Sequence, residues 1–381
     1  GARRAAWAPC PQLAAAVVID EHDESLQEER APTWHARDVL VERARRAGAV
    51  VLLTSPVPTV AGLDVCGTEP ARLDRATERA GWPAVEVVDR RGDEPWKTSL
   101  VTSPLVAALR DHDRRVVCVH NVPARSRVLA CRTCSALLRC EQCRAAVGLT
   151  DDEQLECRRC GTVRAAVCQV CGGTSLANLR PGVTRLAEEL EAAAGRPVTS
   201  VSGGRATVDE ELTGDVFVGT EAVLHRVRPP VDVVAFLDID RELLAPRYRA
   251  AEQTMALFVR AARLLGRRSR GGRILVQTYL PDHPLIQSLA VADPTRLLAA
   301  EREQREALEL PPVSALASIE GDDSDGLVAA VAAYDGVVTG AVGDGRTLVR
   351  AASWMTLGEQ LLAAKAASGS AARIVVDPPR V

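Results

Sequence analysis

Eight of the eleven cysteines fall into four pairs, each with two residues between its members. A CxxC turn offers two thiolates to one tetrahedral Zn²⁺ ion, and two such turns close a four-thiolate site. No apolar run is long enough to span a bilayer and no signal-peptide pattern is present, so we expect a cytoplasmic chain, in which such pairs favour metal over disulfide. The sequence therefore predicts two zinc ions per chain, bound by Cys131, Cys134, Cys140, Cys143, Cys157, Cys160, Cys168 and Cys171.

The spacing of the pairs indicates which of them share an ion. Residues 144–156 separate the second pair from the third, which is a normal interval for a zinc ribbon. Joining these two pairs leaves the first and fourth for the other ion. The predicted sites are therefore nested, with Cys140, Cys143, Cys157 and Cys160 inside Cys131, Cys134, Cys168 and Cys171. A sequential pairing needs much shorter loops and ranks second.

A closed four-thiolate site has no coordination position for water or substrate, so we expect both sites to support folding and recognition rather than catalysis. The alternatives are disulfides or a redox centre. A redox centre needs one pair rather than four, and a disulfide framework is typical of small secreted chains. Cys10, Cys66 and Cys118 lie outside the pattern and are expected to be buried as small apolar residues.

Charge is nearly balanced over the chain. The formal net charge is −3, which excludes a polycation that coats nucleic acid by bulk charge, so any DNA contact must be local. The densest basic segment runs from Arg260 to Arg273 and contains no acidic residue. It is either a solvated helix end or a surface that faces phosphates.

Short apolar segments alternate with helical patterns. Strands are expected at 14–20, 49–55, 116–120, 198–201, 216–219, 233–240 and 273–279, and helices at 35–47 and 183–194. Another helix is expected over 248–265, where Ala251, Met255, Phe258, Ala262 and Leu265 recur at helical spacing. The alternation predicts an α/β fold with a parallel sheet covered on both faces.

Proline-containing breaks divide the chain into three predicted parts. Residues 1–95 form one α/β unit, in which the strands at 14–20 and 49–55 are expected to be central. Residues 96–310 form a second unit that carries the zinc-binding insertion at 129–173. Residues 311–381 are expected to form a small α+β domain, with strands near 313–320, 347–351 and 372–376.

Several segments resemble the PriA family of primosomal replication-restart helicases. The opening GARRAAWAP is similar to the family's GTRSALFxP, and VVIDEHDES with HARD at 35–38 is similar to its DEEH box and trailing HARD. Further along, VFVGTE resembles IGTQ, FLDIDRELLAPRYRAAEQ resembles the DVD box with its downstream RxxE, and LPPVS resembles the LPP entry to the C-terminal domain. The four CxxC pairs and HARD are the specific parts of a resemblance that spans nearly the whole chain.

The resemblance implies two RecA-like helicase lobes, the first incomplete, with the zinc-binding insertion in the second and a small C-terminal α+β domain. It implies a replication-restart primosome protein that recognises stalled or abandoned forks and helps to reload the replicative helicase. The expected partners are branched or forked DNA, single-stranded DNA, single-stranded DNA-binding protein, and the primosome and helicase-loading proteins, with no membrane. By this resemblance we expect the family's separate N-terminal DNA-binding region to be missing and residue 1 to lie after the place of the phosphate-binding loop.

The motor motifs depart from the family's pattern. Ile19 stands where the first, metal-coordinating Asp of the DEEH box belongs, which leaves Asp20, Glu21 and His22 as remnants. In the arginine-finger segment Leu264 takes the first finger position and Arg267 retains the second; losing a finger costs about 10³-fold or more in rate. The family's GSATP, NRRG and lysine-glycine motifs are replaced by TSPVP at 54–58, NVPA at 121–124 and HR at 225–226.

We therefore expect a degenerate helicase without catalytic residues, in which Asp20, Glu21 and His22 are either vestigial nucleotide contacts or the polar end of a strand. Two other functions stay open. One is an active ATP-dependent 3'-5' DNA helicase whose ATP-binding loop lies upstream of this chain, and the other is a zinc-ribbon RNA- or protein-binding module.

Candidate DNA contacts lie in two segments. Trp34 and Arg37 flank the acidic box, where the family has an aromatic-rich coupling loop, and Arg267 and Arg268 lie in the basic segment. Stacking aromatics and phosphate-binding arginines are the groups that bind single strands. Trp34 also fits the alternative of a core aromatic.

Overall fold

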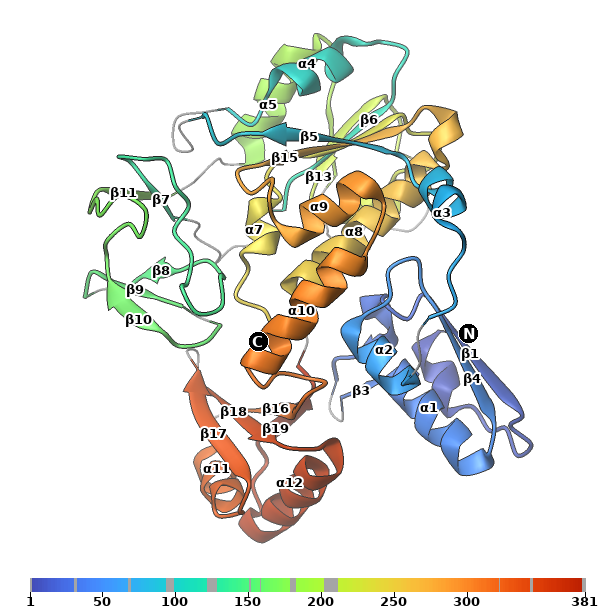
Figure 1. Cartoon of the computed structure of the whole chain (residues 1–381), viewed down its shortest axis with the longest axis vertical. Coiled ribbons are helices and arrows are strands. Elements are labelled where there is room, and N and C mark those ends of the chain that lie inside the picture. The colour runs from blue at the N-terminus through green and yellow to red at the C-terminus, as the bar shows by residue number, and fades with distance from the viewer. Residues whose placement is uncertain are drawn as a thin grey trace. The chain divides into compact units, whose positions relative to one another are not determined.

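The computed structural model divides into two compact units (Figure 1). It describes residues 2–30, 33–67, 70–93, 99–121, 129–150, 152–157, 159–178, 183–201, 212–321, 323–342 and 345–378. Unit 1 comprises Gly1–Ala71, Arg247–Gln253 and Leu298–Val381, and unit 2 comprises Arg72–Pro246 and Thr254–Leu297. The replaced NRRG motif, apart from Asn121, lies outside the described residues.

Unit 2 is built on a six-stranded, all-parallel sheet with the strand order β12-β13-β6-β14-β15-β5. Its strands are β5 (Ala84–Asp89), β6 (Val116–Val119), β12 (Thr199–Val201), β13 (Val216–Gly219), β14 (Val233–Phe236) and β15 (Arg273–Thr278). Every residue of β6, β13 and β14 is buried, as expected of strands covered on both faces. The predicted parallel α/β sheet is confirmed.

Helices cover both faces of this sheet (Figure 1). On one face, Leu109 of α4 (Ser103–Arg110) and Leu190 of α5 (Val183–Ala194) pack against Cys118 and its neighbours. Side chains alternate along a strand, so Phe236 points to the other face, where its ring lies 4.3 Å from that of Phe258 in α8 (Ala250–Leu265). The predicted helix over 248–265 is confirmed, and its apolar stripe forms part of the core.

Shorter elements complete unit 2: α3 (Arg75–Gly81), α6 (Ala222–Arg226), α7 (Asp240–Leu243), η3 (Arg268–Arg270), α9 (Pro284–Val291) and the start of α10 (Thr295–Ala307). The edge strand β5 pairs with β15, so residues 84–89 share the second sheet, although the sequence analysis assigned them to residues 1–95. Periodicity identifies a strand without naming its partner. The domain ranges drawn from the sequence remain predictions.

The cysteine-bearing insertion lies between β6 and α5 and consists of short antiparallel strands. β7 (Leu129–Cys131) pairs with β11 (Leu176–Asn178), and β8 (Gly148–Leu149), β9 (Gln154–Glu156) and β10 (Val163–Ala165) form a second small sheet. The Ala146 N–H donates to the Leu244 carbonyl over 2.7 Å. Leu137, Leu244 and Leu280 pack in one apolar cluster, which joins the insertion to the body of unit 2.

The N-terminal part of unit 1 pairs β1 (Ala15–Ile19) with β4 (Val50–Thr54) in parallel. One face of this pair carries Val17, Ile19, Val50 and Leu52, and all four side chains are more than half exposed. The prediction that these strands are central is therefore wrong for the described residues, in which they pair with each other alone. Around them lie η1 (Arg3–Trp7), η2 (Glu24–Leu26), β2 (Gln27–Glu28), β3 (Trp34–His35), α1 (Ala36–Ala47) and α2 (Val60–Cys66).

The C-terminal part of unit 1 is a four-stranded antiparallel sheet with the order β17-β18-β16-β19, packed on two helices. Its elements are β16 (Ala315–Glu320), α11 (Asp325–Ala332), β17 (Val337–Val342), β18 (Arg346–Ala351), α12 (Trp354–Ser368) and β19 (Arg373–Val376). Three of the strands match the sequence prediction, and β17 was not predicted. In the described part of the chain, no helix has the length and apolarity needed to cross a membrane.

Candidate metal centres and the acidic box

The four CxxC pairs adopt four copies of one backbone turn. In each copy, the N–H of the residue after the second cysteine donates to the carbonyl oxygen of the first cysteine, over 2.8 to 2.9 Å. That residue has a positive φ in every copy: Ser135, Arg144, Gly161 and Gly172. A positive φ costs nothing at glycine and is unusual at serine and arginine, so the turn is kept even where the sequence does not favour it.

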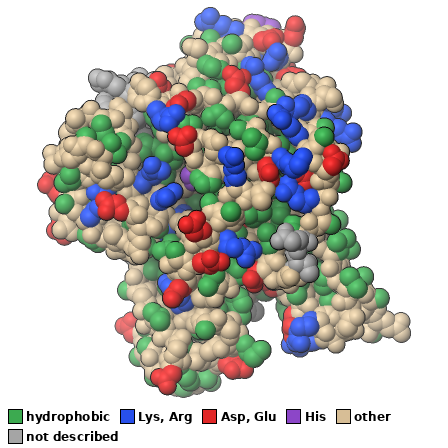
Figure 2. All heavy atoms as spheres, viewed as in Figure 1, with side chains coloured by type: hydrophobic (Ala, Val, Ile, Leu, Met, Phe, Trp, Pro, Cys, Tyr) green, Lys and Arg blue, Asp and Glu red, His purple; other side chains and the backbone are tan. Residues whose placement is uncertain are grey.

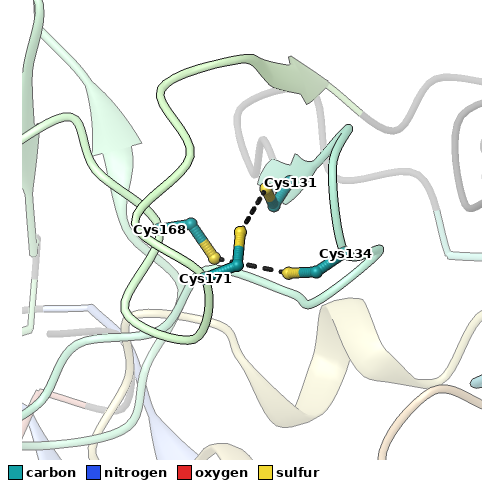
Figure 3. Close-up of side chains that lie close together, drawn as sticks. All are labelled: Cys131, Cys134, Cys168 and Cys171. Carbon is teal, nitrogen blue, oxygen red and sulfur yellow. Dashed lines mark hydrogen bonds between the residues drawn. The ribbon is translucent and has the colours of Figure 1, made fainter.

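The eight sulfurs lie in two groups, and within each group they are all within 4.8 Å of one another. The outer site is Cys131, Cys134, Cys168 and Cys171 (Figure 3), and the inner site is Cys140, Cys143, Cys157 and Cys160. These are the nested groups expected from the spacing. Sulfurs of facing pairs are 3.6 Å apart in the outer site and 3.3 to 3.4 Å apart in the inner site.

Both groups suit a tetrahedral ion with soft ligands. A Zn–S bond of about 2.3 Å places the sulfurs of a tetrahedral site about 3.8 Å apart, close to the separations found. Polar groups also contact the sulfurs: the Thr133 N–H lies 3.4 Å from Cys131 Sγ, and Thr162 Oγ1 lies 3.1 Å from Cys160 Sγ. Such contacts disperse the charge of coordinated thiolates. Bound zinc would cross-link the strands that carry each pair.

The three remaining cysteines differ from one another. Cys118 is buried in β6, where burial raises the pKa of its thiol to about 12. Cys10 and Cys66 are exposed, so the prediction that all three are buried is wrong for these two. Cys10 follows η1 in a loop, and Cys66 is the last residue of the short helix α2. The apolar character of cysteine alone does not determine whether a residue at such a position is buried.

The acidic box follows β1 directly and is held in place by protein groups. Glu21 is 2% exposed, and its carboxylate accepts hydrogen bonds from the Thr59 N–H at 2.6 Å and the Thr59 hydroxyl at 2.8 Å. Arg37 Nη1 lies 3.2 Å from the same carboxylate. Thr59 caps the N-terminus of α2, so Glu21 anchors that helix end, where a negative charge is favourable.

The neighbours of Glu21 in the sequence differ from it in exposure and in the groups that they contact. Ile19 is 70% exposed on the open face of the β1–β4 pair. Asp20 has a φ of 55°, which turns the chain sharply after the strand. His22 Nδ1 lies 2.8 Å from the hydroxyl oxygen of Ser55, so the box contacts the TSPVP segment. The structure thus brings His22 and Glu21 close to the segment at 54–59.

The chain was compared with known proteins. No family model matches it. It is 30% identical to the replication restart protein PriA of Treponema pallidum over 334 residues, which cover 82% of this chain and 50% of that protein. It is 29% identical to PriA of Thermotoga maritima over 331 residues (82% and 44%) and 26% identical to PriA of Bacillus subtilis over 359 residues (87% and 44%). The chain belongs to the PriA family. It spans about half the length of these relatives.

The HARD segment, which is among the specific parts of the PriA resemblance, begins α1. His35 Nδ1 accepts the Arg37 N–H at 3.2 Å and caps the helix. Burial and the charge of Arg37 lower the pKa of His35 to about 4, so the ring stays a neutral acceptor. Arg37 is 4% exposed and is paired with Glu21 and Asp38. The buried Arg37 side chain therefore helps to fix the position of Glu21 in the acidic box.

Trp34, the other candidate DNA contact in this segment, is half-buried. Its ring meets the ring of Trp7 edge to face, with centroids 5.7 Å apart. The structure therefore pairs the aromatic residue with the N-terminal 3₁₀ helix. A half-exposed ring can pack against the protein with its buried part and still offer its exposed part to a DNA base.

The basic segment that resembles PriA's arginine fingers ends α8 and continues through η3. Arg267 and Arg268 are exposed, whereas Leu264, at the first finger position, is buried. On the face shown in Figure 2, Lys and Arg side chains gather around α3, which contacts η3, with acidic side chains among them. The second pair of predicted DNA contacts is thus on the surface of unit 2, and the first pair is not freely exposed.

Two buried groups were not assigned roles from the sequence. Asp240, in the segment that resembles the DVD box, accepts the Thr278 hydroxyl and the Tyr279 N–H at 2.8 Å. Burial and the nearby Asp238 raise the pKa of Asp240 to about 7. The DxD pattern was a usable signal for this residue. His120, at the end of β6, is also buried, and burial lowers its pKa.

The RxxE segment forms a buried ion cluster in unit 1. Arg249 pairs with Asp377 at 2.5 Å, and the Tyr248 hydroxyl donates to the same carboxylate. Glu252 pairs with Arg305 at 2.6 Å and accepts the Val60 N–H at 2.7 Å. These partners are far apart in the sequence, so no local pattern could have joined them.

Proposed function

We propose that this chain is a replication-restart protein of the PriA type that binds branched or forked DNA and docks primosome proteins without driving unwinding by ATP hydrolysis. The family relationship supports the replication-restart role, because the relatives matched over most of this chain carry that name. The region that resembles the helicase motor would then have a structural role, and the zinc insertion would bind partner proteins.

The observation that carries the proposal is the state of the Glu21 carboxylate. A helicase motor needs carboxylates free to hold Mg²⁺ and orient the attacking water. In this chain Glu21 accepts hydrogen bonds from Thr59 and pairs with Arg37, and an exposed isoleucine stands at position 19. An apolar side chain cannot coordinate a metal, so the acidic box supports the fold of unit 1 instead.

The arginine-finger segment supports the same conclusion. Leu264 is packed in the core, and a leucine cannot stabilise the charge that develops on a transferring phosphoryl group. Arg267 keeps a cationic side chain on the surface. We assign Arg267 and Arg268 to the DNA backbone, with Trp34 as a candidate stacking residue.

The zinc insertion is the proposed docking element. Two zinc ions per chain would hold its short strands, which carry too little apolar surface to fold alone. Its expected partners are the primosome and helicase-loading proteins and single-stranded DNA-binding protein. Single-stranded DNA and forks are the proposed nucleic-acid partners.

An active ATP-dependent 3'-5' DNA helicase is the second candidate. It is favoured by the lengths: the chain spans about half of its relatives, so a phosphate-binding loop elsewhere in a longer protein would complete a site. This candidate requires Glu21 to exchange Thr59 and Arg37 for a metal-bound water.

One experiment separates the two. ATP hydrolysis is measured with and without forked DNA, on full-length native protein containing two zinc ions, and fork binding is measured on the same sample by fluorescence anisotropy. We expect fork binding without DNA-stimulated turnover. Stimulated turnover that is lost in Arg267→Ala would establish the helicase and reject the proposal.

A further inference from the structure

The two metal sites differ in their access to solvent. In the inner site three of the four cysteines are buried and Cys160 is half-buried. In the outer site Cys171 is exposed and Cys134 is half-buried. Cys171 is therefore more accessible to a small reagent in solution than the cysteines of the inner site.

The surroundings of the two sites enlarge this difference. Arg159 covers the inner site, with its guanidinium donating to the carbonyl oxygens of Cys143 at 3.2 Å and Ala245 at 3.0 Å. The outer turn carries Val170, which is 68% exposed, between its two cysteines. The body of unit 2 therefore braces the inner site, and the outer turn lies at the surface.

Gly173 packs closely against the outer site. A Cβ added at Gly173 would lie 2.9 Å from Thr133 Oγ1, 3.3 Å from Cys171 Sγ and 3.4 Å from Cys131 Sγ. The glycine therefore leaves room for the Thr133 hydroxyl and for these two sulfurs to lie close together. The same two sulfurs are 3.6 Å from each other (Figure 3).

We propose that Cys171 is an oxidation site for hydroperoxides, and that its oxidation joins it to Cys131 in a disulfide and opens the outer site while the inner site stays intact. Metal-coordinated and otherwise stabilised thiolates are nucleophilic, and among them the accessible ones are oxidised first.

The chemistry balances with a hydroperoxide as the oxidant. The Cys171 thiolate attacks the O–O bond, an S–O bond forms, and the alkoxide or hydroxide leaves, which gives a sulfenic acid. The Cys131 thiolate then attacks Cys171 Sγ, the S–S bond forms, and hydroxide leaves. Two thiolates, one hydroperoxide and two protons thus give one disulfide, one water and one alcohol, or two waters from hydrogen peroxide.

The consequence is a local change in the insertion. Two of the four outer sulfurs are no longer available as ligands, so an ion held there is released and the turn from Cys168 to Gly173 loses its cross-link to Cys134. The contacts of Ala146 and Arg159 with the body of unit 2 remain. Oxidation would therefore alter the outer surface of the insertion without unfolding unit 2.

The test uses the full chain with Cys10→Ser and Cys66→Ser, which remove the two other exposed thiols. Zinc-loaded protein is treated with hydrogen peroxide, zinc release is followed with a chromogenic chelator, and disulfides are mapped by mass spectrometry of non-reduced peptides. We expect one zinc equivalent to leave at least about tenfold faster than the second, together with a Cys131–Cys171 disulfide.

Two matched variants isolate the residue. Cys171→His keeps a zinc ligand but removes the oxidisable sulfur, and it should abolish the fast phase; Cys160→His is the inner-site counterpart and should leave the fast phase unchanged. Simultaneous release of both ions, earlier release from the inner site, or a first disulfide without Cys171 or with a partner other than Cys131 would overturn the proposal. Even if a histidine variant fails to bind two ions, the disulfide map of the protein without that substitution still tests whether Cys171 and Cys131 are joined first.

Discussion

The cysteine-bearing insertion and the acidic box both carry side chains of types that can bind a metal, but the two regions hold these side chains differently. In the insertion, eight thiols converge on two points, and the backbone turns that present them occur in four copies. In the acidic box, the Glu21 carboxylate is already bound by Thr59 and Arg37. In the insertion the thiols are grouped so that they could bind an ion, whereas in the acidic box the carboxylate is held by protein groups. A preserved motif therefore indicates function only when its polar atoms are left available.

Among the predicted changes, loss of the inner metal site should have the largest effect, because it should unfold the insertion. Cys143→Ser with Cys157→Ser removes two facing thiols, and apparent zinc-binding free energies of about 10 to 16 kcal/mol in small zinc domains show how much folding can depend on such a site. We expect zinc content to fall from two ions to one or none, and amide hydrogen exchange to become fast over 129–178.

The control for this change is Cys10→Ser, which lies outside both sites. It should leave the zinc content and the exchange pattern as they are in the parent protein. Retention of two ions by the double variant would show that the nested assignment of Cys140, Cys143, Cys157 and Cys160 is wrong.

Removal of the charge at Glu21 should destabilise unit 1 by about 3 kcal/mol, because it leaves a buried arginine without one of its two carboxylate partners. Glu21→Gln is measured by urea unfolding. Glu42→Gln, on the exposed face of α1, removes a carboxylate that also pairs with arginines and should change the midpoint little.

The matched double variant Glu21→Met with Arg37→Met should recover part of the stability lost in Glu21→Gln, because no unpaired charge remains. If Glu21 instead served a working motor, Glu21→Gln would abolish DNA-stimulated ATP hydrolysis and leave the urea midpoint unchanged. That result would show that the Glu21 carboxylate has a catalytic role, and the contrast between the acidic box and the zinc insertion would no longer hold.

The sequence predicted those features whose cause is local. The CxxC spacing predicted the two nested groups of four cysteines, the apolar alternation predicted the parallel sheet of unit 2, and the motif order predicted the family. Contacts between distant residues were not predictable: Thr59 lies 38 residues from Glu21, and Asp377 lies 128 residues from Arg249. Periodicity also does not report what covers a strand, so β1 and β4 were expected to be central and are half exposed.

Charge reversal in the basic segment tests the DNA surface and should have a smaller effect. Arg267→Glu with Arg268→Glu should weaken fork binding by about 1 to 3 kcal/mol and lower the salt dependence of the affinity by about one phosphate contact per arginine. The measurement is anisotropy titration of forked DNA at several salt concentrations. Arg46→Glu, on the exposed face of α1, is the control and should leave both quantities unchanged.

The smallest effect concerns Asp240, the buried carboxyl that the motif comparison left without a role. Its folded-state pKa of about 7, raised by burial and by Asp238, lies above the usual value of 3.8. Between these values the folded protein binds a proton that the unfolded chain has lost, so the stability that Asp240 contributes falls as pH rises toward 7. His35 and His283, with pKa values lowered to about 4, act in the opposite direction, because the unfolded chain protonates first as pH falls below 6.5.

Asp240→Asn isolates the carboxyl, because an amide does not titrate and the two histidines are present in both proteins. Urea unfolding of zinc-loaded protein is measured from pH 5.5 to 8. The stability of the parent relative to the variant should fall over this range by on the order of 1 kcal/mol and then level off. Parallel pH profiles would mean that Asp240 is ionised at all these pH values. Its carboxylate, which accepts hydrogen bonds from the Thr278 hydroxyl and the Tyr279 N–H, would then be a buried charge held by protein groups in unit 2, as the Glu21 carboxylate is in unit 1.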